Sequence, residues 1–295
     1  MLTVSLLDPA FLARLEALRL SVRQVRWGSR LGGSFPISRR GSSIEFADYT
    51  AYTPGDDIRA IDWNLYARLD RLFVKTYKEE IELSVEVVLD ATASMALPTR
   101  RKFERTSQLG LCLAYIALAG GHQVRMSWIK PGGPVATPWF VHRGDLPRLM
   151  SMAESIVPEG HVALSEWMRK ASTALRMRGG QALVISDGMV QPADCFQALH
   201  LAMMKHLEAK IIQVLSPQEL NPARLFRRGV LVDSETGFTH ELAYSASELA
   251  RAVIEHNERL ARFCKRSGIP FAQHRLDEPL EEFVLKDLPA RGFLE

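Results

Sequence analysis

The stretch Val85-Glu86-Val87-Val88-Leu89-Asp90-Ala91-Thr92-Ala93-Ser94-Met95 gives the strongest indication of how this chain folds. Its first half is an almost continuous apolar run, which is typical of a strand buried on both faces of a parallel sheet. The run ends in one carboxylate and two hydroxyls, spaced two residues apart at Asp90, Thr92 and Ser94. Oxygen ligands of this kind suit magnesium. The stretch therefore predicts a central strand followed directly by a candidate cation site.

The chain after Ser84 alternates between strand-like and helix-like patterns, which predicts a three-layer α/β fold with a mostly parallel sheet. The Pro-Gly-Gly-Pro sequence at 131–134 joins two strand-like runs tightly and indicates one antiparallel edge strand. A hairpin insertion is expected near 228–241. We expect strands at 84–89, 123–130, 136–141, 181–186, 209–215 and 269–274, and helices at 101–120, 144–156, 163–177, 193–206 and 245–267.

A second buried strand, Leu183 to Ser186, ends in Asp187-Gly188. The carboxyl ends of parallel strands meet at one edge of a sheet, so Asp187 is a candidate ligand beside Asp90. Gly188 would let the backbone turn away sharply. The alternative is that both aspartates simply cap the helices that follow. Two strands that both end in aspartate favour the cation site.

The first 80 residues are expected to form an appended segment that packs on the α/β domain at 81–295. Asp8-Pro9 begins an amphipathic helix that we expect to run from Phe11 to Val22. Its arginines are interpreted as a solvated face, with an acidic partner or phosphate site as the alternative.

The segment around Pro54 and Gly55 has the residues of a type II turn. Asp56 or Asp57 is expected to cap a short helix that contains Ile58, Ile61 and Trp63. The charges that follow are interpreted as an ion-pair network, with a carboxylate site for catalysis or a second cation as the alternative. Trp63 and Tyr66 are expected to pack in a core, although they also permit stacking on a ligand. The charged residues are Arg59, Asp62, Arg68, Asp70 and Arg71.

Composition points to an ordinary soluble globular protein, with 295 residues, 47% hydrophobic residues and a net charge of +3. So small a net charge argues against a dedicated nucleic-acid binder. Cys112, Cys195 and Cys264 form no CxxC pair, which indicates a reducing compartment. The N-terminus lacks the residue order of a signal peptide, and the apolar run from Leu109 to Gly121 is too short to span a bilayer. We therefore expect a cytoplasmic protein without membrane insertion.

Two sets of residues resemble known families. Asp90, Thr92 and Ser94 with Asp187 resemble the metal-ion-dependent adhesion site of von Willebrand factor A domains. Nearly the whole chain resembles a bacterial family known as domain of unknown function 58, through the segments Glu45–Tyr49, Tyr52–Arg59, Ile61–Asn64 and Ala67-Arg68. This resemblance implies a von Willebrand factor A-like sheet. It also implies a partner, because such proteins tend to be encoded beside MoxR-type AAA+ ATPases that are thought to mature or activate other proteins.

The sequence departs from the adhesion-site pattern at two positions. Thr92 replaces the usual serine and keeps the hydroxyl. Val162 stands where the resemblance implies a ligating threonine, and valine offers no ligand atom. The alternatives are that His161 or Ser165 takes over that role, that the site binds its cation weakly, or that metal binding is lost.

The resemblance and the oxygen ligands together favour a non-enzymatic, chaperone-like adaptor that binds proteins through a partial magnesium site. The main alternative is a metal-dependent hydrolase that uses Asp90 and Asp187. The sequence contains no HExxH, GxSxG or GxxxxGK[ST] motif, which argues against the corresponding hydrolases and against ATP hydrolysis by the chain itself. A third alternative is nucleic-acid binding through the N-terminal arginines and Arg39-Arg40.

Overall fold

The computed structural model describes residues 8–21, 45–54, 58–78, 83–175, 180–189, 192–205, 207–221, 230–232, 239–241 and 246–295. The chain divides into two compact units. Unit 1 comprises Met1–Gly32 and Leu83–Glu295, and unit 2 comprises Gly33–Glu82. This division differs from the predicted boundary at residue 80, because the N-terminal helix belongs to unit 1 and not with the segment around Pro54.

Unit 1 contains a six-stranded sheet with the strand order β10-β7-β6-β3-β4-β5. Strand β3 pairs in parallel with β4 on one side and with β6 on the other, whereas β5 runs antiparallel to β4. The predicted α/β fold with one antiparallel edge strand is therefore confirmed. The strands are β3 (Ser84–Asp90), β4 (Gln123–Ile129), β5 (Val135–Ala136), β6 (Gln181–Ser186), β7 (Glu208–Leu215) and β10 (Phe271–Arg275).

The edge strand is shorter than the predicted strand at 136–141. Strand β5 ends at Ala136, and the pairing resumes only at a single bridge between Val124 and Phe140. Pro138 lies between these two points and has no N–H to donate to a neighbouring strand. The ladder is therefore interrupted there.

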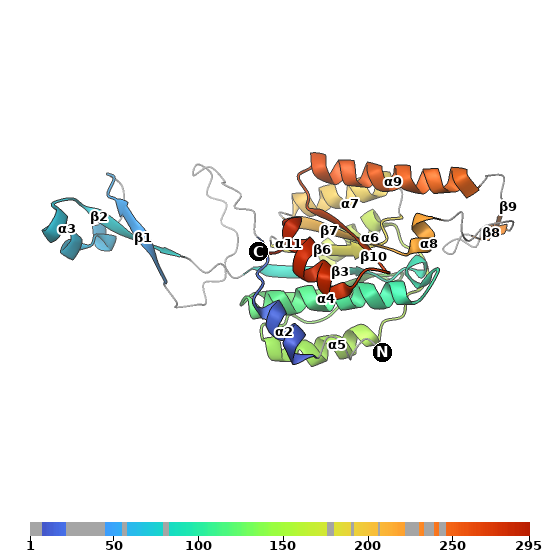
Figure 1. Cartoon of the computed structure of the whole chain (residues 1–295), viewed down its shortest axis with the longest axis horizontal. Coiled ribbons are helices and arrows are strands. Elements are labelled where there is room, and N and C mark those ends of the chain that lie inside the picture. Colours follow the sequence, from blue (N-terminus) through green and yellow to red (C-terminus); the bar gives the residue numbers. More distant parts are fainter. Residues whose placement is uncertain are drawn as a thin grey trace. The chain divides into compact units, whose positions relative to one another are not determined.

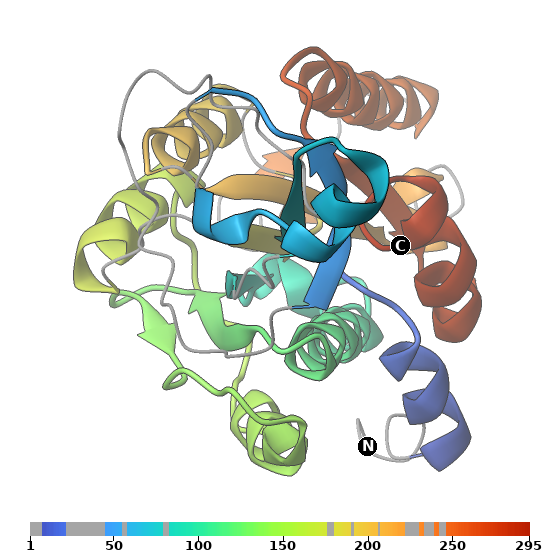
Figure 2. The same cartoon turned by 90° about the vertical axis from the view of Figure 1, so that its left-hand side faces the viewer.

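Helices cover both faces of the sheet (Figures 1 and 2). Helix α4 (Arg101–Ala119) lies on one face, with α2 (Pro9–Glu16) and α5 (Leu146–Glu154) packed outside it. Helices α6 (Leu164–Ala174), α7 (Pro192–Met204) and α9 (Ala246–Arg266) cover the opposite face. These positions confirm the predicted helices to within a few residues. The short helices are η2 (Ala93–Ala96), η3 (Arg143–Asp145), α8 (Pro217–Leu220), α10 (Leu280–Glu282), η5 (Phe283–Asp287) and α11 (Leu288–Ala290).

Helix α4 is the central helix of the main core. It is apolar on nearly all sides because it is enclosed between β3 and β4 on one side and α2 and α5 on the other. At Gly110 the helix approaches the sheet so closely that a Cβ atom there would lie 2.7 Å from Leu89 Cδ2. The helix therefore fixes the position of β3, and with it the residues that follow Leu89.

The N-terminal helix ends earlier than predicted. Helix α2 stops at Glu16, and Leu20 then forms an antiparallel bridge with Leu294 near the C-terminus. The backbone hydrogen bonds of Arg19 go to Glu295 in both directions, so they are not available to a helix. Val22, the predicted end of the helix, lies outside the described residues.

Unit 2 contains an antiparallel pair of strands, β1 (Glu45–Ala51) and β2 (Phe73–Lys78), with η1 (Ile58–Ala60) and α3 (Trp63–Leu69) between them in sequence. The N-cap of α3 is Asp62, whose Oδ1 accepts hydrogen bonds from the backbone of Asn64 and Leu65. The predicted caps Asp56 and Asp57, and Gly55 of the predicted turn, lie outside the described residues.

A separate hairpin lies between β7 and α9 in sequence. Strands β8 (Val230–Val232) and β9 (Thr239–Glu241) pair antiparallel, which confirms the hairpin predicted near 228–241. Of the helices in the described part of the chain, none has the length and apolar character needed to cross a membrane.

Candidate functional site

The carboxyl ends of β3 and β6 bring the two predicted aspartates to one edge of the sheet. The strands are in parallel register with Leu89 opposite Ile185, so Asp90 lies beside the Ser186-Asp187 pair. Both carboxylates are buried, with 3% of Asp90 and 2% of Asp187 exposed. This arrangement follows from the pairing of two apolar strands that end at the same level.

The side chains of Asp90, Thr92 and Ser94 converge as the sequence predicts. Asp90 Oδ1 accepts hydrogen bonds from the Thr92 backbone at 3.0 Å and from Thr92 Oγ1 at 2.7 Å. Thr92 Oγ1 in turn lies 3.1 Å from Ser94 Oγ. The other carboxylate oxygen, Asp90 Oδ2, accepts a hydrogen bond of 2.6 Å from Ser186 Oγ. Sequence reasoning missed Ser186, although its hydroxyl next to Asp187 at the strand end was a usable signal.

The loop that carries Val162 closes over this cluster. The Ala93 N–H donates to the Gly160 carbonyl and the Glu159 N–H donates to the Ala91 carbonyl, which ties the loop to the turn after β3. A small pocket results at this point. It is lined by Asp90, Thr92, Ser94, Ile129, His161, Val162, Leu164, Ser186, Asp187 and Met189. Val162 thus faces the site and contributes only apolar surface.

Of the two predicted substitutes for the missing threonine, only His161 lines the pocket. Ser165 is directed elsewhere, because its hydroxyl and its backbone N–H both donate to Asp194 at the start of α7. The Asp194 carboxylate also accepts from the Leu164 N–H at the start of α6, so Ser165 takes part in joining α6 to α7 and does not replace the ligand. The prediction that Ser165 could compensate is therefore wrong.

Asp187 is held differently from Asp90. Its Oδ2 lies 3.0 Å from Lys102 Nζ, and its Oδ1 accepts a hydrogen bond of 3.0 Å from the Met189 backbone. Lys102 also lies 2.6 Å from Glu219 Oε1 in α8, and its side chain is completely buried. Nothing in the sequence around Lys102, which lies in the first turn of α4, distinguishes it from a surface lysine.

The turn after Asp187 is fixed by its neighbours. Gly188 has φ +65°, and a Cβ atom there would lie 3.0 Å from Leu260, so the expected need for glycine is confirmed. Gln213 Nε2 donates to the Asp187 carbonyl and to Asn257 Oδ1. Helix α9 thus takes part in holding the backbone of the site.

The electrostatics of the site favour a bound cation. Burial, and next the negative charge of Asp187, raise the pKa of Asp90 to about 6, although hydrogen bonds from Ser186 and Thr92 oppose the shift. Burial alone would lower the pKa of Lys102, but the charges of Asp187 and Glu219 outweigh it and raise that pKa. The cluster therefore contains three carboxylates and one ammonium group, and Lys102 contacts two of the carboxylates, those of Asp187 and Glu219. When all are ionised, two negative charges are left without compensation.

The residues present fit a divalent cation. One carboxylate and neighbouring hydroxyls supply hard oxygen ligands, and the negative charge of the cluster would attract Mg²⁺. Asp90, Thr92 and Ser94 would hold the ion. Among the described residues there is no cluster of three or more histidine, cysteine, aspartate or glutamate side chains arranged for a metal, so the hydroxyls are essential to this site.

The segment around Asp62 in unit 2 has mainly structural contacts. Besides capping α3, Asp62 accepts a hydrogen bond of 3.0 Å from the Tyr49 hydroxyl through Oδ2. Arg59, Arg68 and Pro54 are exposed. Trp63 and Tyr66 are 63% and 40% exposed and contact each other edge to face, so the expectation that both pack in a core is wrong.

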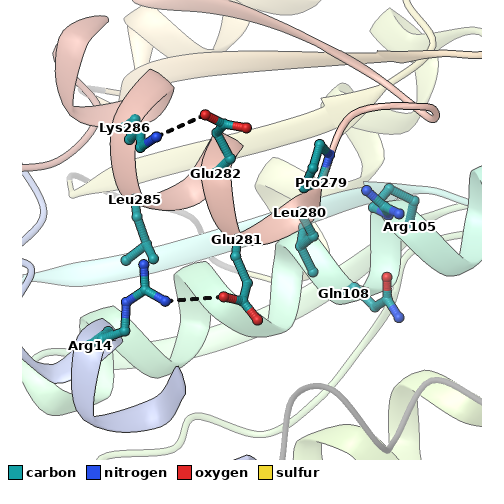
Figure 3. A pocket seen from close by; sticks show the side chains of 9 residues that line it. All are labelled: Arg14, Arg105, Gln108, Pro279, Leu280, Glu281, Glu282, Leu285 and Lys286. Atoms are coloured by element: carbon teal, nitrogen blue, oxygen red, sulfur yellow. Dashed lines mark hydrogen bonds and ion pairs between the residues drawn. The ribbon is translucent and has the colours of Figure 1, made fainter. Parts of the chain in front are cut away.

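A second hollow of about 690 Å³ lies between α2, α4 and the C-terminal helices (Figure 3). Its charged side chains are largely paired: Arg14 lies 3.1 Å from Glu281, and Lys286 lies 2.8 Å from Glu282. Arg105 donates to the carbonyl of Glu278 and to the ring of His274. Because these groups already satisfy one another, the hollow is a weaker candidate than the edge of the sheet.

The fold and the site together define an α/β protein with a candidate oxygen-ligand cation site at the carboxyl ends of its strands. A sequence model described as "Protein of unknown function DUF58" matches residues 48–262, which is more than half of the chain. The protein therefore belongs to this family.

Relatives and solved structures extend the comparison. The chain is 27% identical over 277 residues to uncharacterised proteins of Mycobacterium bovis and Mycobacterium tuberculosis, covering 92% of this chain and 86% of each relative. It is similar to the structure of a conserved hypothetical protein, BatB, from Bacteroides thetaiotaomicron, with 16% identity, a TM-score of 0.42, and coverage of 71% of this chain and 98% of that chain. A von Willebrand factor type A structure from Catenulispora acidiphila matches with 16% identity, a TM-score of 0.34, and coverage of 62% and 43%.

Proposed function

We propose that this protein is a non-enzymatic adaptor that binds other proteins at the carboxyl edge of its sheet through a divalent cation, magnesium. The observation that carries the proposal is the convergence of Asp90, Thr92 and Ser94 on one another beside a pocket. Two of these three groups are neutral hydroxyls. A cation held there keeps net positive charge, which is the property needed to attract a carboxylate of a partner.

Exposed apolar side chains on the loops of this edge support a protein partner rather than a small polar substrate. Leu97 follows η2, Val157 precedes the loop of Val162, and Met189 lines the pocket itself. They are 48%, 53% and 36% exposed. Apolar residues around a charged centre are typical of surfaces that bind proteins.

The proposed partners are a MoxR-type AAA+ ATPase and a client protein that the pair matures or activates. This part of the proposal is supported by the family, whose members tend to be encoded beside such ATPases. We propose the cytoplasm as the compartment, since the three free cysteines, Cys112, Cys195 and Cys264, are all buried as thiols.

A hydrolase that uses Asp90 and Asp187 together is less well supported. The ion pair with Lys102 occupies one oxygen of Asp187, and the Met189 backbone occupies the other. A carboxylate held in this way is poorly placed to serve as a general base. Turnover in a screen of phosphoesters and peptides that is lost in Asp90→Ala would favour the hydrolase instead.

The proposal is tested by measuring capture of a MoxR-type ATPase from the same genome on the immobilised protein, with Mg²⁺ or with EDTA. We expect capture in Mg²⁺, and loss of capture in EDTA and in Asp90→Ala. Asp145→Ala serves as the control, because Asp145 lies in η3 and, among the residues that the structure describes, its carboxylate forms an ion pair with exposed Arg148. Equal capture in Mg²⁺ and in EDTA would rule out the role of the cation.

A further inference from the structure

Lys102 is the unusual component of the site. Lysine is rarely buried without a partner because its ammonium group loses hydration. Here the side chain is fully buried, and its Nζ lies between Asp187 Oδ2 at 3.0 Å and Glu219 Oε1 at 2.6 Å. A permanent positive charge therefore lies directly against one of the two carboxylates at the candidate cation site.

We propose that Lys102 is a positioning residue that competes with the divalent cation for Asp187 and so weakens cation binding at this edge. The inference rests on the proposed function, because it concerns the same site. It goes beyond that function by assigning to α4 and α8 the control of how tightly the cation is held.

The contacts of the two aspartates carry the argument. The hydrogen bonds of Asp90 come from neutral groups, namely Thr92 and Ser186, whereas Asp187 is paired with an ammonium group. Lys102 thus neutralises Asp187, and its charge repels any second cation that approaches. Asp90 is left as the main anionic ligand. The site is therefore tuned toward weak and reversible binding, which suits an adaptor that must release its partner.

Glu219 has the opposite effect to Lys102, because it strengthens cation binding at this edge. It belongs to α8, where it forms a capping box with Ser216: Glu219 Oε2 accepts from the Ser216 backbone and Ser216 Oγ accepts from the Glu219 backbone. The other oxygen, Glu219 Oε1, lies 2.6 Å from Lys102 Nζ, which also lies 3.0 Å from Asp187 Oδ2. Glu219 shares the ammonium group with Asp187 and adds negative charge. Loss of Lys102 and loss of Glu219 should therefore shift cation affinity in opposite directions.

The test is calorimetric titration of the full-length protein with Mg²⁺. Lys102→Met should tighten binding about tenfold or more, and Glu219→Gln should weaken it about tenfold. The control is Lys130→Met, which removes a positive charge at the same sheet edge from a lysine that pairs with Glu159 at 2.7 Å. We expect the control to stay within about twofold of the wild type.

Lys102→Met could unfold the protein, since it leaves the buried carboxylate of Asp187 and the partly exposed carboxylate of Glu219 without a counter-charge. The double variant Lys102→Met/Glu219→Gln leaves one carboxylate rather than two without a counter-charge, and it should bind Mg²⁺ about tenfold more tightly than Glu219→Gln alone. Weaker binding in both single variants, or no change in either, would overturn the role of Lys102 and leave the cation site intact. Absence of Mg²⁺ binding in the wild type and in every variant would overturn the cation site as well.

Discussion

Ser186 Oγ donates a hydrogen bond of 2.6 Å to Asp90 Oδ2 and so joins the carboxyl ends of β6 and β3. Both residues are buried, although they are far apart in the sequence. The bond orients the carboxylate so that its other oxygen meets the hydroxyl of Thr92. The two central strands, and not the loop after β3 alone, therefore determine the geometry of the candidate cation site.

The variant Asp90→Asn should stabilise the protein without divalent cations and abolish stabilisation by Mg²⁺. Burial and the charge of Asp187 raise the pKa of Asp90 to about 6, above its ordinary value of 3.8, so the ionised carboxylate is unfavourable in the folded state. Each unit of such a shift corresponds to about 1.4 kcal/mol at neutral pH. Thermal unfolding at pH 7.5 in EDTA should show a higher Tm for the variant, and only the wild type should respond to Mg²⁺. A lower Tm of Asp90→Asn in EDTA would contradict this account.

His274 should make the protein sensitive to mild acid. Burial, and next the charge of Arg105, lower the pKa of His274 to about 3, compared with 6.5 for the unfolded chain. The stability that the neutral, buried His274 contributes is therefore fully present above pH 6.5 and is lost as the pH falls toward 3. Denaturant unfolding between pH 6.5 and 5 should show a loss of about 1.4 kcal/mol per pH unit that is absent in His274→Gln.

The control for this measurement is His142→Gln, because His142 is exposed near the end of the edge segment. The other groups that face His274 are Asp277 and Glu278, whose Oε2 lies 3.9 Å from Nδ1. If His274→Gln loses stability with acid as steeply as the wild type and the control, the buried histidine does not cause the sensitivity.

Gly180→Ala should be strongly destabilising. Gly180 has φ +92°, and a Cβ atom there would lie 2.1 Å from the Ser84 carbonyl oxygen at the start of β3. Both the backbone strain and the clash with main-chain atoms must be relieved, so we expect a loss of about 3 kcal/mol or more in the free energy of unfolding. Gly121→Ala is the matched comparison, because φ is +78° there and no atom lies within 4 Å. Equal losses in the two variants would show that the clash contributes nothing.

The sequence predicts the sheet well because its strands carry unambiguous patterns. Strands β3, β6 and β7 are rich in aliphatic residues, a pattern that is typical of the interior of a parallel sheet. Their carboxyl ends then follow from topology alone, which is why Asp90 and Asp187 could be placed at one edge. The convergence of Thr92 and Ser94 was predictable from their spacing of two residues.

The parts of the site that escaped prediction depend on tertiary contacts. The sequence shows Lys102 as an ordinary helix lysine, and only its tertiary contacts with Asp187 and Glu219 reveal that it is buried and paired. The length of α2 depends on pairing between Leu20 and Leu294, residues at opposite ends of the chain. Local patterns contain no information about such distant partners.

The most direct test of the proposed cation site is isothermal titration calorimetry with Mg²⁺, carried out on the wild type and on Asp90→Ala. We expect one site with a dissociation constant in roughly the micromolar to millimolar range for the wild type, and no measurable binding for Asp90→Ala. The fold of the variant is checked by circular dichroism. Mg²⁺ binding that is equally strong in the folded Asp90→Ala variant, or absent from the wild type, would contradict the account.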